Sequence, residues 1–282
     1  MEQNLLEIRE QQKESWNRFS QGWKKWDDLF MDFLQPMGDG IIHALDLEDT
    51  DTVLDVAAGT GEPGLTIATR LNAGKVVITD LAEDMLEIAR ESAIKRGISN
   101  IETHVCDVCE LPFEDATFDA VSCRFGFMFF PDMKLAASEM VRVLKPGGRI
   151  AASVWNVAEK NFWITAILGA IQKNISLPVP IPGSPGMFRC SNANVISDLF
   201  KDAGLEYILV KETSGKLKCK NAETYWNVMT EVAAPIVSAL NNADQNLREK
   251  IKAEVFETLH ERYVPDRIEI ESSAWIISGR KA

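Results

Sequence analysis

Three aspartates stand at the ends of three short apolar segments, where a carboxylate could bind a ligand. Asp55 lies within VLDVAAGTG (residues 53–61), Asp80 ends KVVITD, and Asp107 follows IETHVC. Each segment has the composition of a buried strand, and parallel strands present their carboxyl ends at one edge of a sheet. The three carboxylates are therefore predicted to form one rim. In it, Asp80 suits the hydroxyls of a ribose and Asp107 an exocyclic amine such as that of adenine.

Glycines follow Asp55 in the first segment. A Cβ at Gly59 or Gly61 would obstruct a ligand, so these positions favour a close approach to the backbone. The next helix is expected to begin near Pro63, since proline suits a first helical turn. Residues 59–64, GTGEPG, also satisfy G-x-G-x-x-G, which leaves a nicotinamide-dinucleotide site as an alternative. Asp55 argues against it, because the first dinucleotide glycine normally follows an apolar strand.

Alternating strands and helices are expected to position these residues. From residue 52 onward, short apolar segments alternate with segments of helical periodicity. This alternation predicts an α/β fold, a Rossmann-like, seven-stranded, mostly parallel sheet with helices on both faces. Strands are expected at 52–58, 75–81, 101–108, 116–127, 149–155, 205–218 and 267–281.

Composition limits the classes of partner. Lys and Arg number 30 against 42 Asp and Glu, the net charge is −12, and no basic block stands out. Such a chain gains little from releasing phosphate counterions, so neither a nucleic acid nor an anionic membrane surface is expected as a partner. The N-terminus is charged and no apolar run approaches the ~18 residues of a membrane span. Neither a signal peptide nor integral membrane association is therefore expected.

The cysteines favour a reducing compartment and no metal site. The chain has five, and Cys106 and Cys109 form its one C-x-x-C pair, without the second pair or neighbouring histidines that would complete a zinc site. A chain of 282 residues is long enough to bury its own core without disulfides. The protein is therefore expected in the cytoplasm, with no bound metal.

Taken in order, the motifs resemble those of class I S-adenosylmethionine (SAM)-dependent methyltransferases. VLDVAAGTG resembles the first motif of that family, VVITDLAEDMLEIAR the second, THVCDVCELPFEDATFDAVSC the next two, and RVLKPGGRIAASVW the segment before strand five. The resemblance covers residues 50–155 and is nearest to the small-molecule enzymes around the ubiquinone/menaquinone-biosynthesis C-methyltransferases. It implies SAM as the cofactor and methyl transfer to a small-molecule acceptor (EC 2.1.1.-).

The resemblance also implies roles for individual residues. The turn at 57–61 would contact the methionine part of SAM, Asp80 the ribose hydroxyls and Asp107 the adenine amine. Arg124 lies where the methionine tail and the acceptor meet in that family. The residues expected at the cofactor are Asp55, Ala57, Ala58, Gly59, Thr60, Gly61, Asp80, Leu81, Met85, Cys106, Asp107, Val108 and Arg124.

One segment lacks a motif found in some members of the family, and this narrows the range of expected substrates. Residues 123–130, CRFGFMFF, lack the Asn/Asp-Pro-Pro-aromatic box of enzymes that methylate nucleic-acid amines or protein glutamine. Those substrates are therefore not expected.

Aromatic residues are expected to bind the acceptor. Large rings in residues 1–35 recur at spacings of three and four, which predicts one helix with an aromatic stripe that ends near Pro36 and Gly38. The stripe packs on the core, closes as a lid, or does both. N-terminal helices in this family often close over the cofactor, and aromatic faces suit a sulfonium or a flat molecule. The predicted substrate wall consists of Trp23, Trp26, Phe129, Trp155, Phe188 and Trp226.

The whole chain, 1–282, is predicted to be a single methyltransferase domain. Its expected parts are a 1–38 N-terminal helical lid, a 40–155 SAM-binding core, helical substrate covers at 156–200 and 219–265, and final strands at 205–218 and 267–281.

The expected reaction is methyl transfer to a small, flat or apolar molecule, and the accepting atom (C, O, N or S) stays open. Because SAM carries an activated methyl group, alignment and exclusion of water can supply much of the acceleration without a nucleophile or a metal. The sequence identifies no general base. Two alternatives remain, a SAM-binding protein without transfer activity and a nicotinamide-dependent oxidoreductase.

One further match is interpreted as accidental. Tyr207-Ile-Leu-Val-Lys211 has the Tyr-x-x-x-Lys spacing of short-chain dehydrogenases. That pair needs a helix to place both side chains on one face, whereas residues 205–218 alternate as a strand does.

Overall fold

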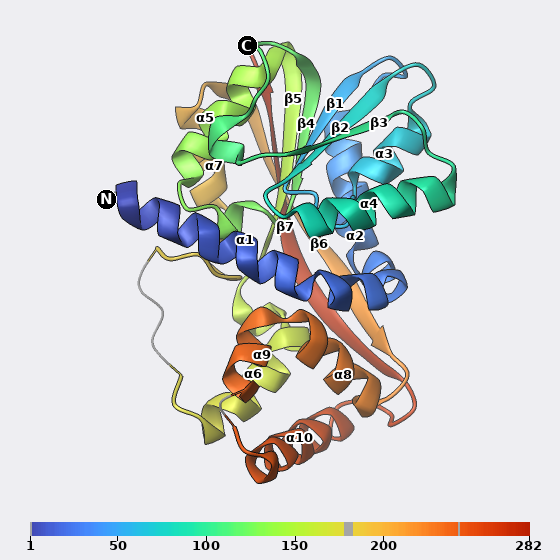
Figure 1. Cartoon of the computed structure of the whole chain (residues 1–282), viewed down its shortest axis with the longest axis vertical. Helices are drawn as coiled ribbons and strands as arrows, with labels where there is room; N and C mark the ends of the chain where they lie inside the picture. The colour runs from blue at the N-terminus through green and yellow to red at the C-terminus, as the bar shows by residue number, and fades with distance from the viewer. Residues whose placement is uncertain (1, 178–182, 242) are drawn as a thin grey trace.

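The computed structural model describes residues 2–177, 183–241 and 243–282. These residues form the strands β1 (Thr52–Val56), β2 (Lys75–Asp80), β3 (Ile101–Val105), β4 (Phe118–Arg124), β5 (Leu144–Trp155), β6 (Leu205–Cys219) and β7 (Ile268–Lys281). They make one sheet of order β3-β2-β1-β4-β5-β7-β6, in which β1 to β5 are parallel and β7 is antiparallel to both neighbours. The expected Rossmann-like, mostly parallel sheet is confirmed (Figure 1).

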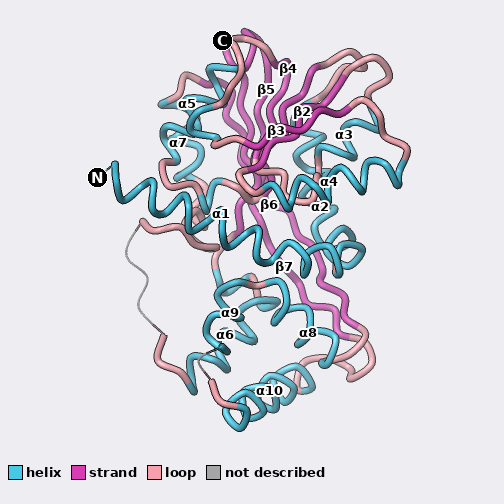
Figure 2. Tube along the Cα trace, in the orientation of Figure 1, coloured by secondary structure: helices cyan, strands magenta, loops and turns pink. Residues whose placement is uncertain are grey.

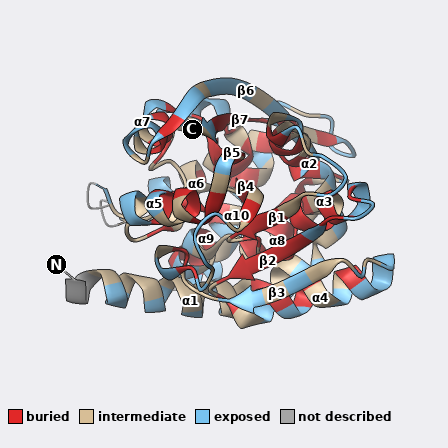
Figure 3. Cartoon of the chain, turned by 90° about the horizontal axis from the view of Figure 1, so that it is seen from above, coloured by how far each residue is buried: buried red, intermediate tan, exposed pale blue. Residues whose placement is uncertain are grey.

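Helices cover both faces of the sheet. In Figure 3, α2 and α3 lie on one side of the strands, and α5 and α7 on the other. The helices are α1 (Glu2–Lys25), α2 (Asp27–Leu45), α3 (Gly64–Arg70), α4 (Glu83–Arg96), α5 (Met133–Val143), α6 (Phe162–Asn174), α7 (Asn194–Asp202), α8 (Ala222–Val232), α9 (Ala234–Asn241) and α10 (Gln245–His260).

A second group of helices lies at one end of the sheet. Figure 2 shows α6, α8, α9 and α10 together beside the far ends of the long strands β6 and β7, with α1 crossing between this group and the rest of the sheet. The Tyr225 hydroxyl of α8 donates a hydrogen bond to the Trp163 carbonyl of α6 at 2.8 Å, which ties two of these helices together. Residues 178–182, which fall in the predicted 156–200 cover, lie outside the described residues.

The N-terminal segment departs from the expected single helix. Two helices form, with Trp26 between them, and α2 continues through Pro36 to Leu45. The buried face of α2 packs on the sheet, and this packing outweighs the ~3 kcal/mol that an interior proline costs. Gly40 permits the close approach, because an added Cβ would lie 3.1 Å from Ile276 Cγ1. The expectation that Pro36 and Gly38 end the helix is therefore wrong.

The central strands are buried on both faces. Val53, Leu54 and Val56 of β1 and Val121 of β4 are at most 1% exposed, as expected for parallel strands between two helical layers. No helix of the described chain is long and apolar enough to cross a lipid bilayer.

Candidate functional site

A buried carboxylate holds the glycine turn that follows β1. Asp55 is fully buried; its Oδ2 accepts a hydrogen bond from the Gly64 amide at 2.8 Å and its Oδ1 one from the Ser122 hydroxyl at 2.6 Å. Burial raises the pKa of Asp55 to about 7, against the opposing effect of these hydrogen bonds. A Cβ at Gly64 would lie 2.7 Å from Asp55 Oδ2. Asp55 therefore fixes the turn from beneath.

Asp80, at the end of β2, holds the turn from the other side. Its Oδ2 accepts a hydrogen bond from the Gly59 amide at 2.8 Å, and its Oδ1 one from the Ala82 amide at 2.9 Å. Burial raises the pKa of Asp80, while these amides favour its ionised form. Gly59 has a φ of 56°, and an added Cβ would meet no atom within 4 Å. The turn thus presents open space above its backbone.

Asp107, the last of the three aspartates, follows β3 and lines the cavity with Asp80, whereas the buried Asp55 is not part of the expected rim. Its Oδ1 accepts a hydrogen bond from the Cys109 amide at 2.9 Å, and its Oδ2 lies 3.5 Å from Nη1 of Arg9 on α1. The N-terminal helix therefore reaches the carboxyl edge of the sheet and places a cation beside this carboxylate.

A cavity of about 350 Å³ joins these strand ends to the aromatic residues. This volume is within the range of small-molecule sites. The cavity wall contains most of the residues predicted at the cofactor and half of those predicted at the substrate. These are Ala57, Ala58, Gly59, Thr60, Asp80, Leu81, Met85, Cys106, Asp107, Val108, Arg124, Trp23, Phe129 and Trp155.

Two residues predicted at the cofactor lie behind the wall. Asp55 is enclosed beneath the turn, as described above. Gly61 faces the protein interior, where an added Cβ would lie 2.8 Å from Leu65 Cδ1. Neither lines the cavity, and their contact with the cofactor stays a prediction.

Three residues of the predicted substrate wall also lie outside the cavity lining. The Trp26 indole donates a hydrogen bond to Glu231 Oε2 at 2.9 Å and thereby joins the α1–α2 junction to α8. Trp226 is buried in the core on α8, and Phe188 packs against that core. Packing between elements sets the orientation of these three side chains, and their contact with the substrate stays a prediction.

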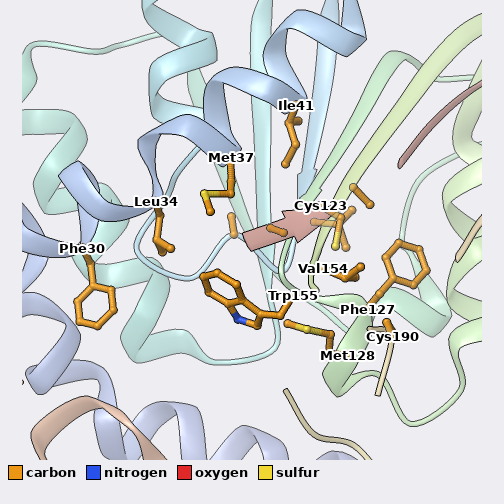
Figure 4. Close-up of a cluster of buried hydrophobic side chains, with 14 of the residues drawn as sticks. Phe30, Leu34, Met37, Ile41, Cys123, Phe127, Met128, Val154, Trp155 and Cys190 are labelled. Carbon is orange, nitrogen blue, oxygen red and sulfur yellow. The ribbon is translucent and has the colours of Figure 1, made fainter. Parts of the chain in front are cut away.

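Aromatic rings form the apolar part of the cavity wall. Phe125 stacks on Trp155 with ring centroids 4.1 Å apart and an interplanar angle of 17°, and Trp16 meets Phe129 edge-on at 5.3 Å. Figure 4 shows Leu34 of α2 beside Trp155, with Met128 on the other side of the indole. This part of the cavity suits a flat or apolar molecule.

The sequence-based prediction missed several residues of the wall. Trp16 and Phe19 belong to the same aromatic stripe as Trp23, and their helical spacing is the signal that could have identified them. The polar residues of α1, the loop residues between α6 and α7 and the residues of α8 have no such signal, because their place depends on contacts between elements far apart in the sequence. These residues include Arg9, Gln12, Ser15, Pro185, Gly186, Met187, Met229 and Val232.

Ion pairs hold α1 across the site. Lys24 contacts Glu91 of α4 at 2.5 Å, and Lys25 contacts Glu231 of α8 at 2.7 Å. At Gly22 an added Cβ would lie 2.2 Å from the Glu231 carbonyl oxygen, so α1 and α8 touch through their backbones. The helix thus connects the sheet with the second group of helices.

A second, charged cavity of about 550 Å³ adjoins the first, and Thr60, Glu62 and Arg124 line both. Glu62 is bound to Arg96 and to the Thr66 amide. Within the described part of the chain, the Arg124 guanidinium makes neither a hydrogen bond nor an ion pair. Burial lowers the pKa of Arg124, and nearby carboxylates oppose this effect. The same part of the chain contains no group of three or more side chains that could hold a metal ion.

The amino-acid sequence is similar to those of known proteins. Residues 53–148 match the family described as methyltransferase domain. A demethylmenaquinone methyltransferase from Thermus thermophilus is 44% identical over 98 residues, which are 35% of this chain and 44% of that protein. A ubiquinone/menaquinone biosynthesis C-methyltransferase from Cellvibrio japonicus is 40% identical over 111 residues, 39% of this chain and 45% of that protein. The chain thus spans less than half the length of these relatives.

Solved structures extend the likeness of fold beyond that segment. The YcgJ protein from Bacillus subtilis has a TM-score of 0.56 and 21% identity, over 88% of this chain and 98% of its own. A putative methyltransferase from Bacillus halodurans has a TM-score of 0.55 and 22% identity, over 86% and 98%. The fold is therefore the one seen in these structures, and residues 53–148 match a methyltransferase domain and resemble the demethylmenaquinone methyltransferases.

Proposed function

We propose that the chain transfers the methyl group of SAM to a small molecule with a flat or apolar body. The observation that carries this proposal is one cavity with two kinds of wall. The turn at 57–60, Asp80 and Asp107 supply polar groups, and Trp155 and Phe129 supply aromatic surface. A cofactor at the polar groups and an acceptor at the rings would therefore share one cavity.

The polar groups fit the parts of SAM. The carboxylate of Asp80 holds two backbone amides and, with about four lone-pair sites, can accept ribose hydroxyls as well. The open space over Gly59 admits a ligand close to the backbone. Asp107 can accept a hydrogen bond from the adenine amine, since only one of its oxygens is bound by a backbone amide. When bound, SAM supplies a methyl group on a positively charged sulfur.

The chain contributes alignment and exclusion of water. Among the described residues, the carboxylates in the wall are Glu62, Asp80 and Asp107, and each already accepts a backbone amide. No carboxylate is therefore assigned as a general base. Proximity in a closed cavity can supply much of the acceleration for an acceptor that is nucleophilic without one. We infer that α1 and the helical segments at 156–200 and 219–265 act as the cover.

The net charge and the cysteines support the class of acceptor and the location in the cell. A net charge of −12 supports a small-molecule acceptor over a nucleic acid. The five cysteines are free thiols, which supports a reducing cytoplasm as the location.

Transfer of a labelled methyl group tests the proposal. The chain is incubated with methyl-labelled SAM and with flat acceptors of four classes, namely activated carbon acids, phenols, amines and thiols. We expect label in one class, and loss of that label in Trp155→Ala with retained binding of S-adenosylhomocysteine. Val264→Ala, which changes an exposed side chain, is the matched control. Binding of S-adenosylhomocysteine without transfer to any class would favour a SAM-binding protein that lacks transfer activity.

A further inference from the structure

An exposed apolar patch lies on the free edge of the sheet. β6 is the last strand in the sheet order, so no strand of the described chain pairs with its outer edge. Figure 3 shows β6 as the outermost strand, with much of its length exposed. Tyr207, Leu209 and Val210 are 77%, 69% and 44% exposed. Residues 206–211, Glu-Tyr-Ile-Leu-Val-Lys, are here named the edge patch.

Folded proteins usually protect such an edge, because an exposed apolar strand is a template for pairing with another chain. Protection by a β-bulge is present only at the start of β6, where the register shifts between Glu206 and Leu209 and Tyr207 has a φ of 51°. From Leu209 to Cys219 the pairing with β7 is continuous. Leu209 and Val210 therefore remain exposed at the beginning of a regular strand.

The charges at the two ends of the edge patch make it complementary to itself. Glu206 precedes the four residues Tyr-Ile-Leu-Val, and Lys211 follows them. Neither charge forms an ion pair within the described chain. When two copies lie antiparallel, Glu206 of each meets Lys211 of the other and the apolar side chains lie between them. A parallel arrangement would instead bring like charges together. A two-fold axis gives the antiparallel arrangement.

We propose that two copies of this chain associate through their edge patches, antiparallel and related by a two-fold axis. The proposal rests on exposure and charge alone and does not depend on the proposed methyl transfer. Tyr207 and Lys211 lie near opposite ends of one contact surface.

Sedimentation velocity over a concentration series tests this dimer. We expect the mass to rise from 31.5 kDa toward twice that value with concentration. Leu209→Asp is expected to raise the dimer dissociation constant at least about a hundredfold, because each dimer contains the change twice. Val264→Asp is the matched control, since Val264 is 68% exposed outside the patch. Circular dichroism and the midpoint of thermal unfolding establish that both variants fold.

Exchange of the two charges tests the antiparallel arrangement separately. Glu206→Lys alone and Lys211→Glu alone are each expected to weaken the dimer, because like charges then meet. The double variant restores the opposite charges and is expected to restore the dimer. A monomer at every concentration, a dimer unaffected by Leu209→Asp, or a double variant as weak as the single ones would overturn the proposal.

Discussion

Asp80→Asn is the sharpest perturbation of the proposed cofactor site. Both oxygens of Asp80 accept backbone amides, from Gly59 at 2.8 Å and from Ala82 at 2.9 Å. An asparagine keeps the shape, but its NH2 group must face one of these amides, so one hydrogen bond is lost along with the charge. The lost backbone hydrogen bond affects the free and bound protein alike, so the change in Kd comes from the bonds that the ribose hydroxyls donate to Asp80; hydrogen bonds to a charged group contribute about 1.5–3 kcal/mol each, and both weaken without the charge. A total of about 2–4 kcal/mol corresponds to roughly a 30- to 800-fold increase in Kd.

Isothermal titration calorimetry with S-adenosylhomocysteine measures this loss without turnover. Asp84→Asn is the matched control, because Asp84 is exposed on α4 and does not line the cavity. The control is expected to bind as the unchanged chain does. An Asp80→Asn variant with an unchanged Kd would refute the assignment of this carboxylate to the ligand.

Three further changes test the turn and the cover. Gly64→Ala places a Cβ 2.7 Å from Asp55 Oδ2 and is expected to lower the free energy of unfolding, measured with urea, by about 1–3 kcal/mol. Burial raises the folded-state pKa of Asp55 from 3.8 to about 7, so the stability due to its protonated form is present below pH 3.8 and is lost as the pH rises to about 7. Relative to Asp55→Asn, the free energy of unfolding is expected to fall over that window by a few kcal/mol. Glu231→Gln weakens the contacts of Lys25 and Trp26 and is expected to speed limited proteolysis of α1, with less than about 1 kcal/mol lost in global stability.

Each of these expectations has a contradicting result. Gly64→Ala at full stability would mean that the turn does not depend on close contact with Asp55. A difference between wild type and Asp55→Asn that is constant from pH 4 to pH 7 would contradict the raised pKa. Unchanged proteolysis of Glu231→Gln would show that α1 is held by other contacts.

The sheet and the polar part of the site could be predicted because their signals are local. A short apolar strand followed by glycines or an acidic residue indicates both a strand and the end of it where a ligand can bind. Asp80, Asp107 and Gly59, which this pattern identifies, line the cavity. Asp55 belongs to the same motif, yet its side chain turns inward. Its partners, Ser122 and Gly64, come from β4 and the start of α3, and no pattern near Asp55 reports them.

The aromatic part could be predicted only in part, because it depends on contacts between distant elements. The spacing of rings places Trp23 on a stripe, but the break at Trp26 turns that indole toward Glu231. Pro36 lies inside α2 because packing on the sheet outweighs its local cost. Which face of α8 meets the cavity is set by its contacts with α1 and α6, so Trp226 could not be placed from helical periodicity alone.

The most direct test of the central claim, that this cavity binds SAM, is thermal unfolding with S-adenosylhomocysteine, SAM and NAD(H). A ligand at about 100 times its Kd stabilises the folded state by about 2.7 kcal/mol, which raises the unfolding midpoint by a few degrees. We predict a shift with S-adenosylhomocysteine and SAM, and none with NAD(H). A shift with NAD(H) alone would contradict the claim and identify the GTGEPG turn as a dinucleotide site.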